Sequence, residues 1–274
     1  MSQNSSIEWT QKTWNPVRGC SRVSEGCRHC YAEVVAGRFC GPGLAYEGLG
    51  TRTSKGARWT GDVRVIEEEV ERPLHMRKPA RIFVNSMSDI FHENLSTEGT
   101  LRVFDVMARA PQHIYQILTK RSDRLAELAP QLPWRSHMWM GVSVESPQYA
   151  HRIDDLRATD AVVKFLSIEP LLAPFEEIDL HAIDWVIVGG ESGVHLYDEK
   201  NRRERGLVER VGGKWMPRED RIGWVRTIRD ACRAQGVAFF MKQWGGPRPK
   251  AAGRMLDGVI HDAYPPLRRS LPMV

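Results

Sequence analysis

The sequence predicts an α/β fold, a partial or full (β/α) barrel of about six to seven parallel strands. Two observations favour this class. Short, nearly all-apolar segments alternate with segments whose apolar residues recur at helical spacing, and polar residues follow most of the apolar segments. Apolar segments of this kind are typical of strands covered on both faces, as in a parallel sheet. We expect residues 1–274 to form a single barrel domain.

The predicted elements follow one another along the chain. A first strand at 13–17 leads into a polar loop at 19–31 and a helix at 31–39, which the Gly-Pro-Gly run after Cys40 ends. A surface excursion at 41–62 and a short helix at 66–76 follow. Further strands are expected at 81–85, 113–118, 138–142, 162–166, 184–188 and 237–241. Further helices are expected at 97–110, after the capping residue Ser122, at 148–158 and at 221–235. A charged insertion at about 194–215 interrupts one strand-to-helix connection.

Composition is that of a soluble globular protein, with 42% hydrophobic and 27% charged residues in 274. No apolar run is long enough to cross a bilayer, so we expect no membrane association. The first residues have neither the basic head nor the apolar core of a signal peptide, which predicts a cytoplasmic protein with reduced thiols. A net charge of +5 is a mild basic bias that is compatible with a phosphate-bearing partner. The sequence does not indicate an oligomeric state.

Three of the five cysteines lie in one loop and are the main functional signal. Cys20, Cys27 and Cys30 have the spacing C-x6-C-x2-C in a glycine-flanked polar segment. Thiolates are soft ligands that select zinc, copper(I) or iron–sulfur clusters. A closed zinc site usually needs a second ligand pair, and no such pair occurs later in the chain. Three thiolates suit a [4Fe-4S] cluster that keeps one iron open for another ligand.

Other interpretations of this loop remain open. The three cysteines could bind zinc together with His29 or Cys40. The C-x2-C spacing is also that of a dithiol redox pair. Simple packing is a poor explanation for three thiols in a short polar loop.

Polar residues cluster where the predicted strands end, which is where α/β barrels and open α/β sheets place their sites. We expect candidate ligands or catalytic groups at these strand ends, although each residue could instead cap a helix or form a turn. They are Ser86, Ser88, Asp89, Lys120, Ser143, Glu145, Glu169, Gly189, Gly190, Glu191 and Lys242.

Several of these motifs carry a resemblance to a known family. The opening run from Ile7 to Ala32, with its three cysteines, resembles a phage-associated, three-cysteine-motif family of uncharacterised proteins. The strand ends NSMSDIFH, ILTKR, GVSVES, SIEP, VIVGGESG and FFMKQWGG fit the same family, over residues 7 to 264. The family is similar in turn to the radical S-adenosylmethionine (SAM) superfamily, whose partial barrels hold a cluster on a three-cysteine loop. The chain departs from the commonest superfamily pattern in its longer first gap and in His29, which replaces an aromatic residue.

The resemblance implies a role for each candidate residue. Cys20, Cys27 and Cys30 would ligate a [4Fe-4S] cluster, and SAM would bind the fourth iron and be cleaved reductively by an electron from an external donor. Ser86, Ser88 and Asp89 would bind the SAM amino group, and Ser143 and Glu145 the ribose. Glu169 and Glu191 would be further acceptors, and Gly189 and Gly190 would allow close backbone approach. Lys120 and Lys242 would bind a substrate carboxylate or phosphate or donate a proton, or each could instead form a salt bridge to a neighbouring carboxylate.

The substrate is not fixed by these motifs. A radical SAM enzyme acting on a nucleic-acid base or nucleotide, in repair or modification, is the first hypothesis. Arg202, Arg203 and Arg205 of the charged insertion could then contact phosphates. A radical SAM enzyme acting on a peptide or small molecule is the second hypothesis, and a non-catalytic zinc- or cluster-binding protein is the third.

Overall fold

The computed structural model describes residues 5–54, 56–194 and 198–266. Its main sheet has seven strands in the order β1-β6-β7-β8-β9-β10-β13. Neighbouring strands pair in parallel from β1 to β8 and again from β9 to β13. This confirms the predicted α/β partial barrel. The chain divides into two compact units, one of residues 1–142 with 158–162 and one of residues 143–157 with 163–274. The prediction of a single domain stays a prediction.

The first unit contains four strands of the main sheet. They are β1 (Lys12–Trp14), β6 (Arg81–Val84), β7 (Ile114–Thr119) and β8 (Met138–Ser143, whose last residue belongs to the second unit). Its helices are α1 (Tyr31–Arg38), α2 (Glu67–Val70), α3 (Thr97–Arg109) and α4 (Ser122–Leu128), with 3-10 turns η1 (Glu25–Cys27), η2 (Arg72–His75) and η3 (Ala129–Gln131). Two small antiparallel pairs complete it, β2 (Val17–Arg18) with β5 (Arg64–Val65) and β3 (Gly50–Thr53) with β4 (Gly56–Trp59).

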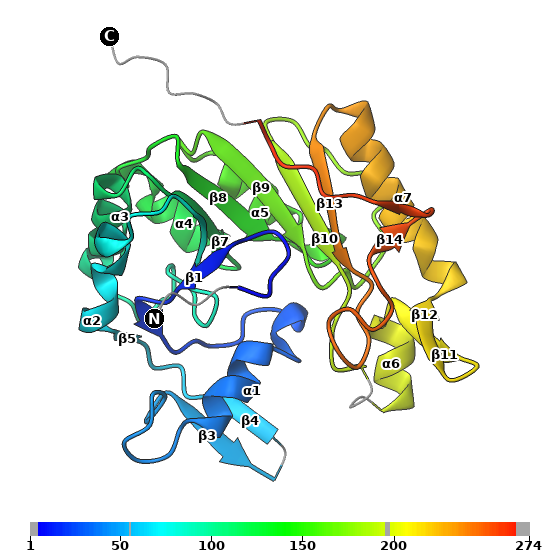
Figure 1. Cartoon of the computed structure of the whole chain (residues 1–274), viewed down its shortest axis with the longest axis horizontal. Coiled ribbons are helices and arrows are strands. Elements are labelled where there is room, and N and C mark those ends of the chain that lie inside the picture. The colour runs from blue at the N-terminus through cyan, green and yellow to red at the C-terminus, as the bar shows by residue number, and fades with distance from the viewer. Residues whose placement is uncertain (1–4, 55, 195–197, 267–274) are drawn as a thin grey trace. The chain divides into compact units, whose positions relative to one another are not determined.

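Burial explains why these strands read as apolar runs in the sequence. Every residue of β8 is buried, as expected for a strand covered on both faces. Helix α3 buries one apolar stripe, including Phe104 and Met107, and the Ser96 hydroxyl caps its first turn by accepting from Gly99 N. Helix α1 lies against the hairpin of β3 and β4 (Figure 1).

The second unit contains the strands β9 (Val163–Ile168), β10 (Trp185–Gly189) and β13 (Ala238–Gln243). Its helices are α5 (His151–Arg157), α6 (Glu199–Arg205) and α7 (Glu219–Ala234), with the 3-10 turn η4 (Pro147–Tyr149). The short pairs are β11 (Val208–Val211) with β12 (Lys214–Pro217), and β14 (Met255–Leu256) with β15 (Val259–Ile260). Strand β10 is fully buried, and α7 runs beside β13 (Figure 1).

Several predicted elements are shorter or more broken than expected. The strand expected at 13–17 ends at Trp14 because Pro16 has no amide hydrogen to pair, and Val17 joins β5 instead. The helix expected at 66–76 splits into α2 and η2 where Pro73 interrupts the helical hydrogen bonds.

The two regions expected to be irregular contain secondary structure. The excursion at 41–62 holds the β3–β4 hairpin, and the charged insertion at 194–215 holds α6 and most of the β11–β12 hairpin. Position 55 of the excursion and positions 195–197 of the insertion lie outside the described residues. Within the described ranges, no helix has the length and apolarity needed to span a membrane.

Candidate functional site

The cysteine loop begins where the first strand of the sheet ends. Strand β1 pairs in parallel with β6, and the chain then turns through Asn15 and Pro16 into the loop. Cys20 follows β2, Cys27 closes the turn η1, and Cys30 is the N-cap of α1. All three are free thiols of intermediate exposure. The loop therefore presents three soft donors that a metal group could reach.

Residues at the end of β6 hold the start of this loop. The Asn15 side-chain oxygen accepts hydrogen bonds from Ser86 Oγ and Met87 N, each at 3.1 Å. Ser88 Oγ donates to Val17 O at 2.7 Å. Ser86 and Ser88, both predicted to bind SAM, thus fix the entry of the loop in this structure, and both remain partly exposed.

A glycine lets the loop pass close to a neighbouring segment. Gly19 has φ +95°, and a Cβ there would lie 2.1 Å from the backbone oxygen of Asp62. Only glycine fits this left-handed, crowded position without displacing backbone.

A buried carboxylate, Glu33 of α1, holds the outer part of the loop. Its oxygens accept two hydrogen bonds from Arg22 Nε at 3.1 Å and a further one from Arg22 Nη2. They also accept from Trp59 N in β4 at 3.0 Å. Since Glu33 is only 3% exposed, this pair fixes the loop on α1 and on the hairpin. The sequence interpretation missed Glu33; its place in the first turn of a predicted helix gave no separate signal.

Asp89 is the centre of a second buried network. Its carboxylate accepts from Thr119 Oγ1 at 2.8 and 2.9 Å, from Phe91 N at 3.0 Å and from Lys120 N at 3.1 Å. It also pairs with Arg121 Nη1 at 3.2 Å. The side chain predicted to bind the SAM amine is therefore buried and surrounded by donors of its own chain.

Burial sets the protonation of the thiols. Burial, together with the nearby charge of Asp89, raises the pKa of Cys20 to about 12, although Arg121 acts in the opposite direction. Burial also raises the pKa of Cys30. Both thiols are therefore protonated at neutral pH in the free chain. A metal group that binds thiolates would release these protons as it loads.

The donor set fits an iron–sulfur cluster. Within residues 5–54, 56–194 and 198–266, no three His, Cys, Asp or Glu side chains converge on a point where one metal ion would sit. A cluster does not require such convergence, since each cysteine binds its own iron. Three partly exposed thiols on one loop match that arrangement.

The strand ends of the second unit carry ion pairs. Glu145 pairs with Arg152 at 2.9 Å and Glu191 with Arg205 at 2.5 Å, and all four side chains are less than a tenth exposed. Arg152 also donates to Ser143 O at 2.8 Å. The carboxylates predicted as ribose or cofactor acceptors thus hold arginines of their own unit.

The predicted glycine pair makes room for protein atoms. A Cβ on Gly189 would lie 2.2 Å from Glu169 Oε1, and one on Gly190 would lie 2.2 Å from Trp244 O. Glu169 Oε1 in turn accepts from Lys242 Nζ at 3.0 Å. The second unit therefore brings Glu169, Gly189 and Lys242 together, and the first unit brings the three cysteines together with Ser86, Ser88, Asp89 and the backbone of Lys120.

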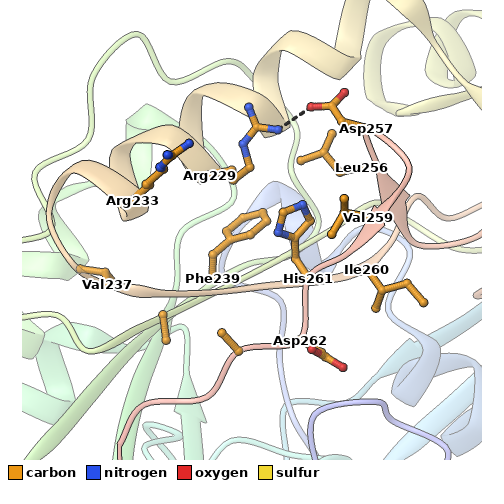
Figure 2. A pocket seen from close by; sticks show the side chains of 12 residues that line it. Arg229, Arg233, Val237, Phe239, Leu256, Asp257, Val259, Ile260, His261 and Asp262 are labelled. Atoms are coloured by element: carbon orange, nitrogen blue, oxygen red, sulfur yellow. Dashed lines mark hydrogen bonds and ion pairs between the residues drawn. The ribbon is translucent and has the colours of Figure 1, made fainter.

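A separate pocket of about 630 Å³ lies away from these strand ends. Helix α7 contributes Arg229 and Arg233, and the amino-terminal half of β13 contributes Phe239 (Figure 2). Arg229 pairs with Asp257 across it (Figure 2). Because this pocket lies at the amino-terminal half of β13 and not at the carboxyl end of that strand, it is not the predicted site.

Comparison with solved structures shows the same fold in spore photoproduct lyase. The lyase complexed with dinucleoside spore photoproduct superimposes with a TM-score of 0.51 and 10% sequence identity, over 90% of this chain and 78% of that chain. A double mutant of the lyase with bound AdoMet and dinucleoside spore photoproduct gives a TM-score of 0.50 at 10% identity, over 91% of this chain and 79% of that chain. No curated protein matches the sequence.

The sequence itself matches a family profile over nearly its whole length. The family is described as "Protein of unknown function (DUF5131)", and the match covers residues 4–265. The chain therefore belongs to the DUF5131 family.

Proposed function

We propose that this protein is a radical SAM enzyme whose cluster is held by Cys20, Cys27 and Cys30. One observation carries the proposal: three free, partly exposed thiols lie in one loop after the first strand of a partial (β/α) barrel. A [4Fe-4S] cluster bound there would supply the electron that cleaves SAM reductively. An external donor would have to deliver that electron. The likeness to spore photoproduct lyase, solved with bound AdoMet, supports the same assignment.

The residues of the first unit would prepare the loop for this group. Ser86 and Ser88 fix the loop entry with their hydroxyl hydrogens, and their oxygens keep lone pairs that can accept from the SAM amine. Asp89, whose carboxylate is buried, would stabilise the end of β7 through its hydrogen bonds to Thr119 and Lys120 and would not bind SAM directly. Lys120, partly exposed after β7, is the candidate of this unit for binding a substrate anion.

The candidates of the second unit are already paired or buried. Glu145 and Glu191 would have to leave buried arginine partners in order to bind SAM. Glu169 and Lys242 are partly exposed and could exchange their mutual ion pair for a ligand. Ser143 is buried, so its hydroxyl would need a ligand that reaches the strand itself.

We propose a nucleic-acid base or nucleotide as the substrate. The net charge of +5 and the exposed Arg52 and Arg58 of the β3–β4 hairpin support it, as does the dinucleoside photoproduct bound by the lyase of the same fold. Arg203 of α6 is exposed, whereas Arg205 is buried against Glu191 and serves the fold. A peptide or small molecule is the alternative substrate class.

Metal and sulfide analysis of protein purified without oxygen tests the cluster. We expect about four irons and four sulfides per chain with a brown visible spectrum, and loss of both in a Cys20→Ala/Cys27→Ala/Cys30→Ala variant. A Cys40→Ala variant is the matched control, because this thiol is partly exposed but lies outside the loop. One zinc and no sulfide would refute the proposal. Reductive SAM cleavage by the loaded protein is the following assay.

DNA binding at increasing salt tests the substrate class. If the protein contacts phosphates, the logarithm of the DNA-binding constant should fall linearly with the logarithm of the salt concentration. The two single variants Arg52→Ala and Arg203→Ala should each make this slope shallower by about 1. Arg109→Ala, an exposed arginine on α3, controls for the loss of charge alone. An affinity that ignores salt would remove nucleic acid from consideration and leave the small-molecule class.

A further inference from the structure

Arg121, the residue after Lys120 at the end of β7, has a role that neither the cysteine motif nor the strand-end pattern assigned. It is a charged side chain with only 6% exposure. Its guanidinium nitrogens contact residues of the cysteine loop and two carboxylates that follow β6. A buried guanidinium needs hydrogen-bond acceptors around it, so the partners of Arg121 show what it organises.

The guanidinium divides its donors between the loop and two carboxylates. Nη2 donates to Ser21 O at 3.2 Å and to Ser21 Oγ at 2.7 Å. Nε donates to Glu93 Oε2 at 2.6 Å, and Nη1 to Asp89 Oδ2 at 3.2 Å. Nη1 also lies 3.9 Å from Cys20 Sγ, within the range of a hydrogen bond to sulfur. One side chain thus joins the first cysteine and its neighbour to the end of β7.

The loop segment is held from its other side as well. Ser21 Oγ donates to Glu93 Oε1 at 2.7 Å and lies 3.0 Å from His92 Nε2. Ser21, Glu93 and Arg121 therefore form a closed ring of hydrogen bonds. Such a ring has little freedom to move, which fixes the backbone next to Cys20.

The charges explain why a cation is needed here. Asp89 places a negative charge near Cys20, Glu93 places a second one against the neighbouring Ser21, and a Cys20 thiolate would add a third. Arg121 is the cation that touches all three groups. Without Arg121, the Cys20 thiolate and these two carboxylates would lose the cation that they share.

We propose that Arg121 is a positioning residue for the candidate cluster: it fixes the Cys20–Ser21 segment and keeps a cation and an N–H donor against the Cys20 sulfur. This inference rests on the proposed function. Hydrogen bonds to cluster sulfurs and nearby positive charge favour the reduced state, so Arg121 also raises the reduction potential of the cluster. Lysine could supply the charge but not the forked set of donors.

The first experiment compares wild type, Arg121→Lys and Arg121→Gln after cluster loading. Partners of ligands typically change metal affinity by about 10- to 100-fold, so we expect Arg121→Gln to lose half its iron at a chelator concentration lower by that factor. The reduction potential of the cluster should be more negative in Arg121→Gln than in wild type. In Arg121→Lys it should lie between the values of these two proteins. An unchanged iron retention and potential in Arg121→Gln would overturn the inference.

Arg157→Gln is the matched control. Arg157 also joins two carboxylates, Asp154 at 2.8 Å and Asp179 at 2.7 Å, and donates to the His181 carbonyl at 3.0 Å, but it lies in the other unit. The Arg157→Gln variant should unfold more easily than wild type but keep the same reduction potential of the cluster. A potential shift of equal size in Arg157→Gln would show a general effect of lost arginine charge and would also overturn the inference.

A second measurement needs no cluster. Trypsin cleavage after Arg22 and Arg28, followed by mass spectrometry of the metal-free protein, reports how firmly the loop is held. Cleavage should be faster in Arg121→Gln than in wild type, and equal rates would refute the positioning role. If wild type takes up no iron, the proposed function fails while this measurement still decides the role of Arg121. If Arg121→Gln does not fold, Arg121→Lys carries both tests.

Discussion

The buried carboxylate of Asp89 gives the sharpest test of how the site is built. Asp89→Asn keeps the size of the side chain and removes its charge. Each carboxylate oxygen accepts from at least one N–H group: Oδ1 accepts from Phe91 N, and Oδ2 accepts from Lys120 N and Arg121 Nη1. The NH₂ of asparagine would therefore meet a donor in either orientation. The structure therefore predicts a loss of stability, whereas a carboxylate held ready for a ligand would be replaced at little cost.

The expected size follows from the partners that remain. Removing one member of a buried ion pair costs about 3–5 kcal/mol. Arg121 keeps Glu93 as a second carboxylate, so we expect the lower end, about 3 kcal/mol. For a domain of this size the melting temperature falls by roughly 2–4 °C for each kcal/mol, which gives a decrease of roughly 6–12 °C.

Thermal and denaturant unfolding of the metal-free protein, followed by circular dichroism, measures this loss. Asp105→Asn is the control, because Asp105 forms an exposed pair with Arg109 that contributes only about 0.3–0.5 kcal/mol. If Asp89→Asn is destabilised by no more than this control, the network around Asp89 does not stabilise the fold, and direct ligand binding becomes the better account of the residue.

Three further outcomes are expected. Gly190→Ala should cost about 3 kcal/mol or more, measured by denaturant unfolding, because its Cβ would lie 2.2 Å from the backbone oxygen of Trp244; a neutral effect would mean that this contact is easily relaxed. Although burial opposes it, hydrogen bonding to Arg121 lowers the pKa of Glu93 from 4.5 to about 2. The ionised carboxylate therefore stabilises the fold above pH 4.5, and this stabilisation is lost as the pH falls through 2. The difference in the free energy of unfolding between wild type and Glu93→Gln should shrink over the same range. A deficit that is constant with pH would contradict this. Cys232 is buried, which raises the pKa of its thiol to about 12, so iodoacetamide at pH 8 should leave it unlabelled by peptide mass spectrometry; rapid labelling would show that α7 opens.

The strands could be predicted because burial on both faces leaves a direct mark on the sequence. The strand expected at 138–142 is β8, and the helix expected at 97–110 is α3. Pro16 and Pro73 interrupt two elements that the apolar pattern alone predicts to be continuous, because proline has no amide hydrogen to donate. The hairpin of β3 and β4 was missed because its exposed, polar and glycine-containing strands resemble a loop.

The partners of the site residues could not be predicted, since they depend on long-range contacts. Arg121 lies 100 residues from Ser21, and nothing in the run after β7 distinguishes it from an ordinary surface arginine. Glu145 and Glu191 did offer a signal. A carboxylate at the end of an apolar strand is costly to bury unless it is paired, so its position predicts a cationic partner.

The polar residues at the strand ends do not all have the same role, and hydrogen-bonding capacity separates them. Asp89 is buried and already accepts from four other residues, so a ligand would have to displace those contacts. Ser86 is partly exposed and donates one hydrogen bond to Asn15, which leaves its oxygen able to accept. The same sequence signal, a polar residue after a buried strand, therefore includes groups that build the cysteine loop and groups that can still bind a ligand. A search for ligand contacts at this site should begin with the partly satisfied serines.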